Sequence, residues 1–167
     1  MASLILLRGN SGSGKTSLAK LLQTRLGANT MRLSHDMVRM EILHVWGREG
    51  AEKSLPLMIS LLQYGRAHCE TVVLEGILPM SDYRPLFEEA QRLYGGRIFA
   101  YYYDLSFEET LRRHATKPNR NDFGESDKRR WWRASDFIGF LPETLLTAEV
   151  SLAEAAARVL RDMGKEG

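Results

Sequence analysis

The sequence predicts an α/β fold in which a doubly wound parallel sheet is covered by helices on both faces. Two observations predict this fold: strand-length apolar runs alternate with helical patterns, and the runs are almost continuously apolar. Such runs are typical of parallel strands buried on both faces, and the strand–helix alternation implies right-handed crossovers. The 167 residues, 44% of them hydrophobic, fit one domain over residues 1–167.

The apolar runs and the helical patterns predict where the elements lie. The expected strands are Ser3–Arg8, Thr30–Ser34, Thr71–Gly76, Arg97–Asp104 and a short one around Leu145–Thr147. The expected helices are Gly14–Leu26, about Asp36–Trp46, Glu52–Cys69, one that begins at Ser106, a short one at Glu125–Arg133, and an Ala-rich last helix. The segments SFEE (Ser106–Glu109) and SLAE (Ser151–Glu154) are capping boxes, which predict the starts of two of these helices.

Charge, cysteine content and hydropathy exclude several classes of protein. The chain has 23 Lys and Arg against 21 Asp and Glu, a net charge of +2, so no strong field favours duplex nucleic acid or a membrane surface. The single cysteine, Cys69, excludes an internal disulfide and a Cys-rich metal site. No apolar run is long enough for a signal peptide or a membrane span, so we expect a soluble, cytoplasmic protein without a membrane partner.

The segment GNSGSGKT (Gly9–Thr16), here called the phosphate loop, matches G-x-x-x-x-G-K-[ST] at every position. It follows a predicted strand and opens a predicted helix, which is the context that this nucleotide-binding motif requires. Glycines let backbone amides converge on a polyphosphate, and the positive end of the helix adds to the field. The residues predicted to bind a nucleoside triphosphate are Gly9, Asn10, Ser11, Gly12, Ser13, Gly14, Lys15, Thr16 and Ser17.

Two residues of this motif have chemical roles of their own. Lys15 is expected to bridge the β- and γ-phosphates during catalysis, and the Thr16 hydroxyl is expected to be one ligand of Mg²⁺.

Carboxylates follow two of the predicted strands. Asp36 comes after the second strand and Glu75 ends the third, and in an open α/β sheet both positions face the ligand cleft. A carboxylate in an apolar strand is costly unless it is paired or bound to metal, which favours a functional role for Glu75, with Gly76 allowing close approach of ligand or backbone. We expect Asp36 to be the base and Glu75 a metal ligand, and the reverse assignment stays open. The alternative is that Asp36 caps the following helix and that Arg39 is only its surface ion partner. If Arg39 is functional, we expect it to bind substrate.

A basic, aromatic segment follows the fourth strand and predicts a lid over residues 113–135. Such a lid excludes water and neutralises the charge that moves during phosphoryl transfer. Arg129 and Arg133, one turn apart on the predicted helix, and Arg113 are the expected phosphate clamps, with Arg129 as a catalytic residue. Arg112 and Arg113 are expected to bind the nucleotide, and Arg112 or one of the tryptophans Trp131 and Trp132 would stack on its base.

Four segments, GNSGSGKTSLA, LSHDMVRMEIL, VVLEGIL and FEETLRRHATKP, together resemble the P-loop kinases of small molecules. The resemblance is to bacterial uridine kinase-like proteins and, more distantly, to chloramphenicol phosphotransferase, gluconate and shikimate kinases, zeta-type toxins and polynucleotide kinases. It implies a five-stranded parallel sheet in the order 2-3-1-4-5, ATP as donor, Mg²⁺, and an arginine-bearing lid. It also implies an acceptor site over the second and third strands, with Asp36 as the usual base. The third strand ends in EGIL and lacks the Asp-Gly-x-Pro-Arg pattern of adenylate kinases, so a nucleoside monophosphate acceptor is not implied.

The expected function is transfer of the γ-phosphate of ATP to a hydroxyl of a nucleoside, a sugar-like metabolite or an antibiotic. One alternative is a kinase of the 5′-hydroxyl of RNA or DNA, against which the near-neutral charge counts. Another is a nucleotide-dependent switch without kinase activity, but the nearest string to its Asn-Lys-x-Asp element, TKPN, lacks the first and last residues. The residue pattern determines neither the acceptor nor the oligomeric state.

Overall fold

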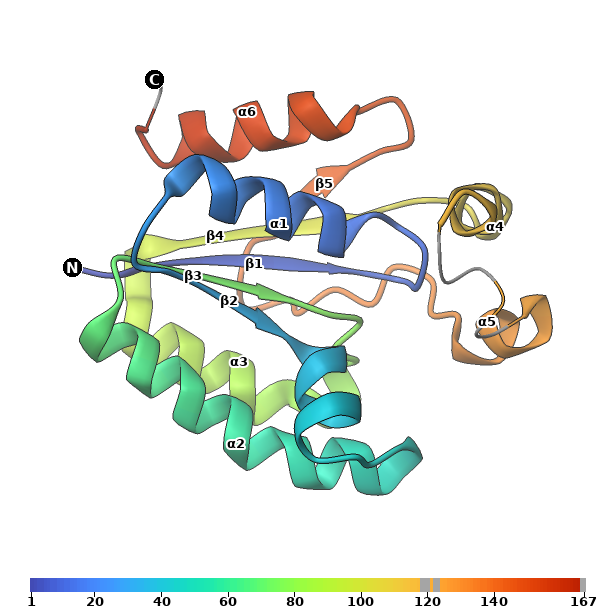
Figure 1. Ribbon diagram of the computed structural model, residues 1–167, viewed down its shortest axis with the longest axis horizontal. Helices are drawn as coiled ribbons and strands as arrows, with labels where there is room; N and C mark the ends of the chain where they lie inside the picture. Colours follow the sequence, from blue (N-terminus) through green and yellow to red (C-terminus); the bar gives the residue numbers. More distant parts are fainter. Residues whose placement is uncertain (118–120, 122–123, 166–167) are drawn as a thin grey trace.

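The computed structural model describes residues 1–117, 121 and 124–165 (Figure 1). The strands are β1 (Ser3–Gly9), β2 (Thr30–Ser34), β3 (Thr71–Glu75), β4 (Ile98–Tyr103) and β5 (Thr144–Leu146). The helices are α1 (Lys15–Leu26), η1 (Met37–Ile42), α2 (Gly47–His68), α3 (Met80–Tyr94), η2 (Gly95–Arg97), α4 (Phe107–Ala115), α5 (Glu125–Trp131) and α6 (Leu152–Asp162). Among the described residues, no helix is both long and apolar enough to cross a membrane.

The five strands form one parallel sheet in the order β2-β3-β1-β4-β5, which confirms the predicted fold class and strand order. In Figure 1, α1 and α6 cover one face of the sheet, and α2 and α3 cover the other. Glu75, the last residue of β3, lies opposite Leu7 of β1 and Ser34 of β2 in the ladder. Because the strands are parallel, their carboxyl ends meet at one edge, where the phosphate loop and the start of η1 also lie.

Alternate residues of β1 supply both halves of the core. Leu4 and Leu6 pack into the cluster on the α2 and α3 side, whereas Ile5 and Leu7 pack into the cluster on the α1 and α6 side. All four are completely buried. A fully buried leucine or isoleucine side chain contributes roughly 1.5–3 kcal/mol. The continuous apolar run was therefore correctly interpreted as a strand covered on both faces.

The region after β2 differs from its predicted helix at Asp36–Trp46. The chain forms a π-helix at Met37–Ile42, in which the Leu43 amide donates to the Val38 carbonyl five residues earlier, at 3.0 Å. The following helix, α2, then begins at Gly47 rather than at Glu52. Widened turns of this kind are often found at functional sites, and this one directly follows Asp36.

The sequence analysis assigned no helix to residues 80–94, where the structure has α3. Pro85 lies inside this helix, within its second turn, where a proline breaks the apparent pattern without preventing the helix. The missed signal was the helical spacing of the buried face, which is formed by Tyr83, Leu86, Phe87, Ala90 and Tyr94.

One of the two predicted capping boxes is complete. Ser151 and Glu154 cap each other's backbone amides at the start of α6. At α4 only half of the box forms: the Ser106 hydroxyl accepts from the Glu109 amide at 3.1 Å, but the Glu109 carboxylate accepts from the Arg112 and Arg113 guanidinium groups instead. Charge-assisted bonds to two guanidinium groups are stronger than a bond to one backbone amide.

Candidate functional site

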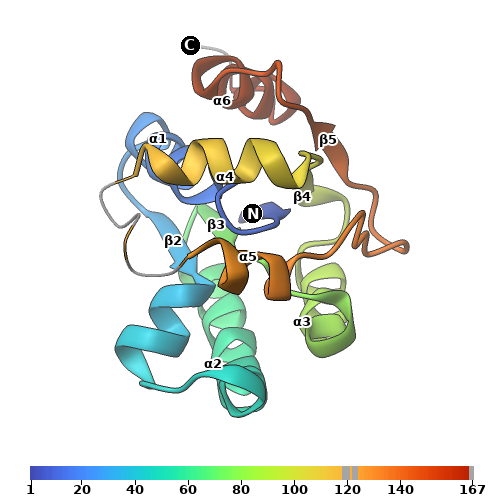
Figure 2. The ribbon, with the colours of Figure 1, turned by 90° about the vertical axis from the view of Figure 1, so that its right-hand side faces the viewer.

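Three glycines give the phosphate loop its shape. Gly9, Gly12 and Gly14 have φ values of 141°, 83° and 105°, a region that residues with a Cβ atom rarely adopt. A Cβ atom on Gly9 would also lie 2.9 Å from the Tyr103 Cβ atom, so glycine is required there for space as well. The last two residues of the loop, Lys15 and Thr16, already belong to α1, and Figure 2 shows the loop behind α4 and α5 at the carboxyl edge.

The Lys15 side chain folds back over the loop. Its ammonium group donates to the Asn10 carbonyl at 2.8 Å and to the Ser13 hydroxyl at 3.1 Å, and the residue is only 7% exposed. Burial lowers the pKa of Lys15 to about 8, and the carboxylates of Glu75 and Asp36 oppose this shift. Both predicted carboxylates therefore lie within electrostatic range of the lysine.

Thr16 and Glu75 are in direct contact. The Thr16 hydroxyl donates to the Glu75 carboxylate at 3.0 Å, joining the first turn of α1 to the end of β3. Glu75 is 3% exposed, whereas Thr16 is exposed. The two residues predicted to share a metal ion therefore lie side by side at the mouth of the loop.

Asp36 lies at the same edge but in a different environment. Its carboxylate is 62% exposed and pairs with the half-buried Arg39 guanidinium at 3.3 Å. In the described part of the chain, the Asp36 side chain makes no capping hydrogen bond to η1, so the helix-cap alternative is not supported. An exposed carboxylate beside a cation is available to a ligand that enters from solvent.

The absence of a side chain at Gly76 leaves room for the side chain of His35. A Cβ atom there would lie 2.5 Å from the Cβ atom of His35, which is buried next to Asp36. The His35 ring is hydrogen-bonded to the Tyr83 hydroxyl, which is 2.9 Å from the Ser54 hydroxyl. Burial, with Arg39 adding to it, lowers the pKa of His35 to about 4, so this ring is neutral at neutral pH. The sequence analysis did not identify this buried network behind Asp36.

The arginines of the predicted lid differ in their contacts. The Arg113 guanidinium donates to the Ser13 carbonyl of the phosphate loop at 2.7 Å. Arg112 pairs with Glu109, and Arg129 pairs with Glu125 while lying over the Phe107 ring, both with exposed side chains. The lid also contains residues 118–120 and 122–123, which lie outside the described residues.

The predicted helix at Glu125–Arg133 is shorter in the structure. It ends at Trp131 and the next residue is extended, so Arg133 does not share a helix face with Arg129 as expected. The backbone of Arg133 is instead held by the Asn10 side chain, which accepts from its amide at 2.8 Å and donates to its carbonyl at 2.6 Å. Asn10 thus attaches the end of the lid to the phosphate loop.

The sequence analysis gave no role to two lysines of the basic segment, and one of them, Lys128, lies at the phosphate loop. The Lys128 ammonium donates to the Thr110 carbonyl at 2.8 Å and would lie 2.5 Å from a Cβ atom on Gly12. Burial lowers the pKa of Lys117, while Glu75 and Asp36 oppose the shift. Sequence spacing alone does not distinguish these lysines from neighbouring arginines.

Arg8, one residue before the phosphate loop, is the centre of a buried ion network. Its guanidinium is completely buried and donates to Glu143 at 2.7 Å, to Asp136 at 3.1 Å and to the Leu78 carbonyl at 3.0 Å. The Asp136 carboxylate also accepts from the Met80 amide at 3.0 Å. This network joins β1, the start of α3 and the segment that follows the lid.

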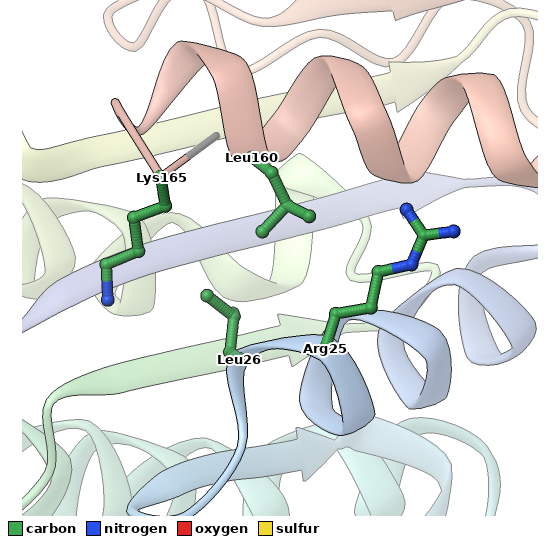
Figure 3. A pocket seen from close by; sticks show the side chains of 4 residues that line it. All are labelled: Arg25, Leu26, Leu160 and Lys165. Carbon is green, nitrogen blue, oxygen red and sulfur yellow. The ribbon is translucent and has the colours of Figure 1, made fainter. Parts of the chain in front are cut away.

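Two of the clefts that the described residues form lie at different ends of the molecule. The larger, of about 370 Å³, lies between the carboxyl ends of α1 and α6, where Leu26 and Leu160 face each other between Arg25 and Lys165 (Figure 3). The other, of about 340 Å³, is lined by Asn10, the end of β4 and Trp132. We place the candidate site at the end of the molecule that holds the second cleft, because this is the carboxyl edge of the sheet, where Lys15, Thr16, Glu75 and Asp36 lie.

No family model matches the chain, and no curated protein is significantly similar to it in sequence. Similar folds occur among solved structures. The APS kinase of Mycobacterium tuberculosis, in complex with AMPPNP and APS, has a TM-score of 0.70 at 21% identity, over 99% of this chain and 98% of that chain. The tunicamycin resistance protein of Deinococcus radiodurans has a TM-score of 0.68 at 16% identity, over 99% and 98%. A gluconokinase of Sinorhizobium meliloti has a TM-score of 0.65 at 16% identity, over 98% and 92%. At these identities the likeness shows a shared fold.

The buried network predicts a large loss of stability when Arg8 is removed. Arg8→Met should lower the free energy of unfolding by about 3–5 kcal/mol, because it leaves the buried Glu143 carboxylate without its partner. Urea denaturation followed by circular dichroism measures the change. Arg48→Met is the matched control, since Arg48 is 93% exposed in its pair with Glu52 and its removal should change stability by less than about 0.5 kcal/mol. Equal effects of the two substitutions would contradict the prediction.

Proposed function

We propose that the protein is an ATP- and Mg²⁺-dependent phosphotransferase that moves the γ-phosphate to a hydroxyl group of a small molecule. The observation that carries the proposal is the contact between Thr16 and Glu75 beside Lys15, with Asp36 at the same edge. A phosphate-binding loop alone is compatible with any nucleotide-binding protein, but this arrangement adds a candidate metal ligand and a candidate base. The fold shared with a gluconokinase and an APS kinase supports a kinase rather than a switch.

The residues at the mouth of the loop fit a magnesium ion. Mg²⁺ is held by one or two carboxylates together with phosphate oxygens and water, and seldom by a cage of protein ligands alone. Among the described residues there is no group of three or more acidic, histidine or cysteine side chains that could hold a metal. Thr16 and Glu75 would hold the ion, and the bound ion would neutralise charge on the phosphates.

The transfer step assigns a separate task to each side chain. The acceptor hydroxyl oxygen forms a bond to the γ-phosphorus, the bond from that phosphorus to the oxygen it shares with the β-phosphate breaks, and ADP leaves. Asp36 accepts the proton of the acceptor hydroxyl, for which its exposed carboxylate is available. Lys15 and the amides of the phosphate loop hold the phosphate oxygens on which charge develops. The reverse assignment, with Glu75 as the base, is disfavoured by its burial and its bond from Thr16.

A small-molecule acceptor is favoured over a nucleic acid 5′-end. The chain carries a net charge of only +2, whereas strand binding needs a basic groove with stacking aromatic residues. The neighbours named for gluconate, APS and tunicamycin also support small acceptors, and we propose a nucleoside, a sugar-like metabolite or an antibiotic as the class. Arg39, beside Asp36, would contact the acceptor.

The function is tested by ATP binding and by acceptor-dependent release of ADP. Calorimetry should detect ATP–Mg²⁺ binding to the wild-type protein, and a screen of nucleosides, sugars and antibiotics should find an acceptor that stimulates ADP release. Lys15→Met should abolish this stimulation, because it removes the ammonium group that we propose binds the phosphates. A folded wild-type protein that binds no adenine nucleotide would disprove the proposal.

The base assignment is tested by Asp36→Asn. This substitution should lower kcat by roughly two to four orders of magnitude, because an amide cannot accept the proton, and it should leave ATP affinity nearly unchanged. Steady-state kinetics with the acceptor found above measures kcat, and calorimetry measures the affinity. Full turnover by the variant would show that Asp36 is not the base, and Glu75→Gln would then be the next variant to measure.

The pKa of Lys15 predicts that ATP affinity depends on pH. Only the protonated lysine attracts phosphate, so affinity should be highest below pH 8 and should fall as the pH rises through about 8. The effect on stability has the opposite sign. Between a pKa of about 8 in the folded protein and 10.5 in the unfolded chain, the unfolded chain binds the additional proton, so the contribution of Lys15 to the free energy of unfolding rises with pH. Calorimetry of ATP binding across this pH range should show a shallower fall of affinity with pH for Lys15→Met than for wild type. Equal slopes for the two proteins would contradict the prediction.

A further inference from the structure

Asp36 lies in the turn between β2 and η1, and its own side chain does little to hold it there. The carboxylate is 62% exposed, and its ion pair with Arg39 is a surface contact of 3.3 Å. The two residues before Asp36 are both buried. The Ser34 hydroxyl accepts from the Met37 amide at 3.3 Å, and the His35 ring is hydrogen-bonded inside the protein. The direction of Asp36 therefore depends on side chains other than its own.

The His35 ring joins the end of β2 to two helices that come later in the chain. Its Nε2 atom is hydrogen-bonded to the hydroxyl of Tyr83 in the first turn of α3, and the two rings meet edge to face with centroids 4.7 Å apart. The Tyr83 hydroxyl is 2.9 Å from the hydroxyl of Ser54 in α2, which lies 3.3 Å from the Ala51 carbonyl. His35, Tyr83 and Ser54 are all buried, and we call them the His35 network. The turn that carries Asp36 is thus attached to both α2 and α3.

Packing against β3 also fixes the ring. A Cβ atom on Gly76 would lie 2.5 Å from the Cβ atom and 3.2 Å from the Cγ atom of His35, so a larger residue there would displace the ring. Gly76 follows Glu75, which lies opposite Ser34 in the parallel ladder. His35 is therefore packed against the strand end that carries the candidate metal ligand.

The hydrogen bonds of the His35 network have one direction that satisfies every donor. Burial lowers the pKa of His35 to about 4, so the ring carries a single proton at neutral pH. Among the described residues, the Nδ1 atom of His35 has no hydrogen-bond partner, so a proton there would be a buried donor without an acceptor. With the proton on Nε2, the ring donates to Tyr83, Tyr83 donates to Ser54, and Ser54 donates to the Ala51 carbonyl. Loss of the Tyr83 hydroxyl would leave the ring N–H without this acceptor.

We propose that His35 is a positioning residue for Asp36. Its bond to Tyr83 and its packing on Gly76 fix the turn that joins β2 to η1, and the turn sets the direction of the candidate base. The role of Asp36 rests on the proposed function, whereas the fixing of the turn is independent of any reaction. A base must lie within hydrogen-bond reach of the acceptor hydroxyl, and a misplacement of about 1 Å can lower a rate about 10²-fold. An exposed carboxylate meets this requirement only if the backbone that carries it is held in place.

The proposal is tested by Tyr83→Phe, which removes one hydroxyl and keeps the ring. With the acceptor found in the screen above, this variant should lower kcat roughly 10- to 100-fold and leave the affinity for ATP–Mg²⁺ unchanged. Tyr94→Phe is the matched control, because Tyr94 is buried in the same helix and its hydroxyl also bonds to α2, at the Leu62 carbonyl, 2.8 Å away. It lies at the other end of α3, so Tyr94→Phe should lower the thermal midpoint by a similar amount and leave kcat unchanged. Equal kcat values for the two variants would overturn the proposal.

A double variant tests whether the His35 network acts through Asp36. In the Asp36→Asn background, Tyr83→Phe should lower kcat by less than about threefold more, because the carboxylate that the network positions is already gone. Losses that multiply in the double variant would show that the network acts elsewhere, and would overturn the proposal. His35→Leu should reproduce the loss caused by Tyr83→Phe, whereas His35→Gln, whose amide can take the place of Nε2, should recover most of kcat.

Amide hydrogen exchange tests the fixing of the turn without any reaction. In Tyr83→Phe, exchange should become roughly 10-fold faster at the Met37 and Leu43 amides, which bond to the turn and within η1, and Tyr94→Phe should leave it unchanged. Wild-type exchange over residues 37–43 in Tyr83→Phe would overturn the proposal. Faster exchange in Tyr83→Phe, together with a wild-type protein that transfers no phosphate, would instead refute the proposed function and leave the His35 network as the anchor of the turn.

Discussion

The carboxyl edge depends on the contact of the Lys15 ammonium group with its own loop. The buried ammonium donates to the Asn10 carbonyl and to the Ser13 hydroxyl. A lysine in this position requires a loop that turns the Asn10 carbonyl towards it to accept the hydrogen bond. The positive φ values at Gly9, Gly12 and Gly14 make that path possible. Surrounding groups then adjust the field: Glu75 and Asp36 stabilise the charged lysine, and Lys117 and Lys128 oppose it.

The two carboxylates lie at neighbouring strand ends, yet their surroundings differ, and the difference is consistent with the division of tasks that we propose. Glu75 is buried and receives a hydrogen bond from Thr16, which holds its oxygens at the mouth of the loop. Asp36 is exposed, precedes a widened helical turn and has a cation for a neighbour. A fixed, buried carboxylate suits a hard metal ion, and an exposed one suits proton exchange with an incoming hydroxyl.

The contacts between the described residues of the predicted lid and the phosphate loop include polar ones. Asn10 holds the backbone of Arg133, and Arg113 donates to the Ser13 carbonyl. Arg8 adds a buried network directly behind the loop, which holds the segment that follows the lid against β1 and the start of α3.

The sequence by itself determined the parallel α/β fold, the phosphate loop and the two carboxylates, because each depends on local information: continuous apolar runs, glycine spacing, and acids at strand ends. The strand order came from the resemblance to P-loop kinases, and the structure agrees with it. The helix α3 was missed, although its buried face has helical spacing and Pro85 lies inside it as Pro56 lies inside the predicted α2. Only the tertiary structure decided which basic side chains reach the loop. Arg129 and Lys128 are adjacent in sequence and alike in charge, but one pairs with Glu125 in solvent and the other is buried over Gly12. That choice depends on how α5 is oriented against α4 and the loop, and a charge pattern along one short helix does not contain this information.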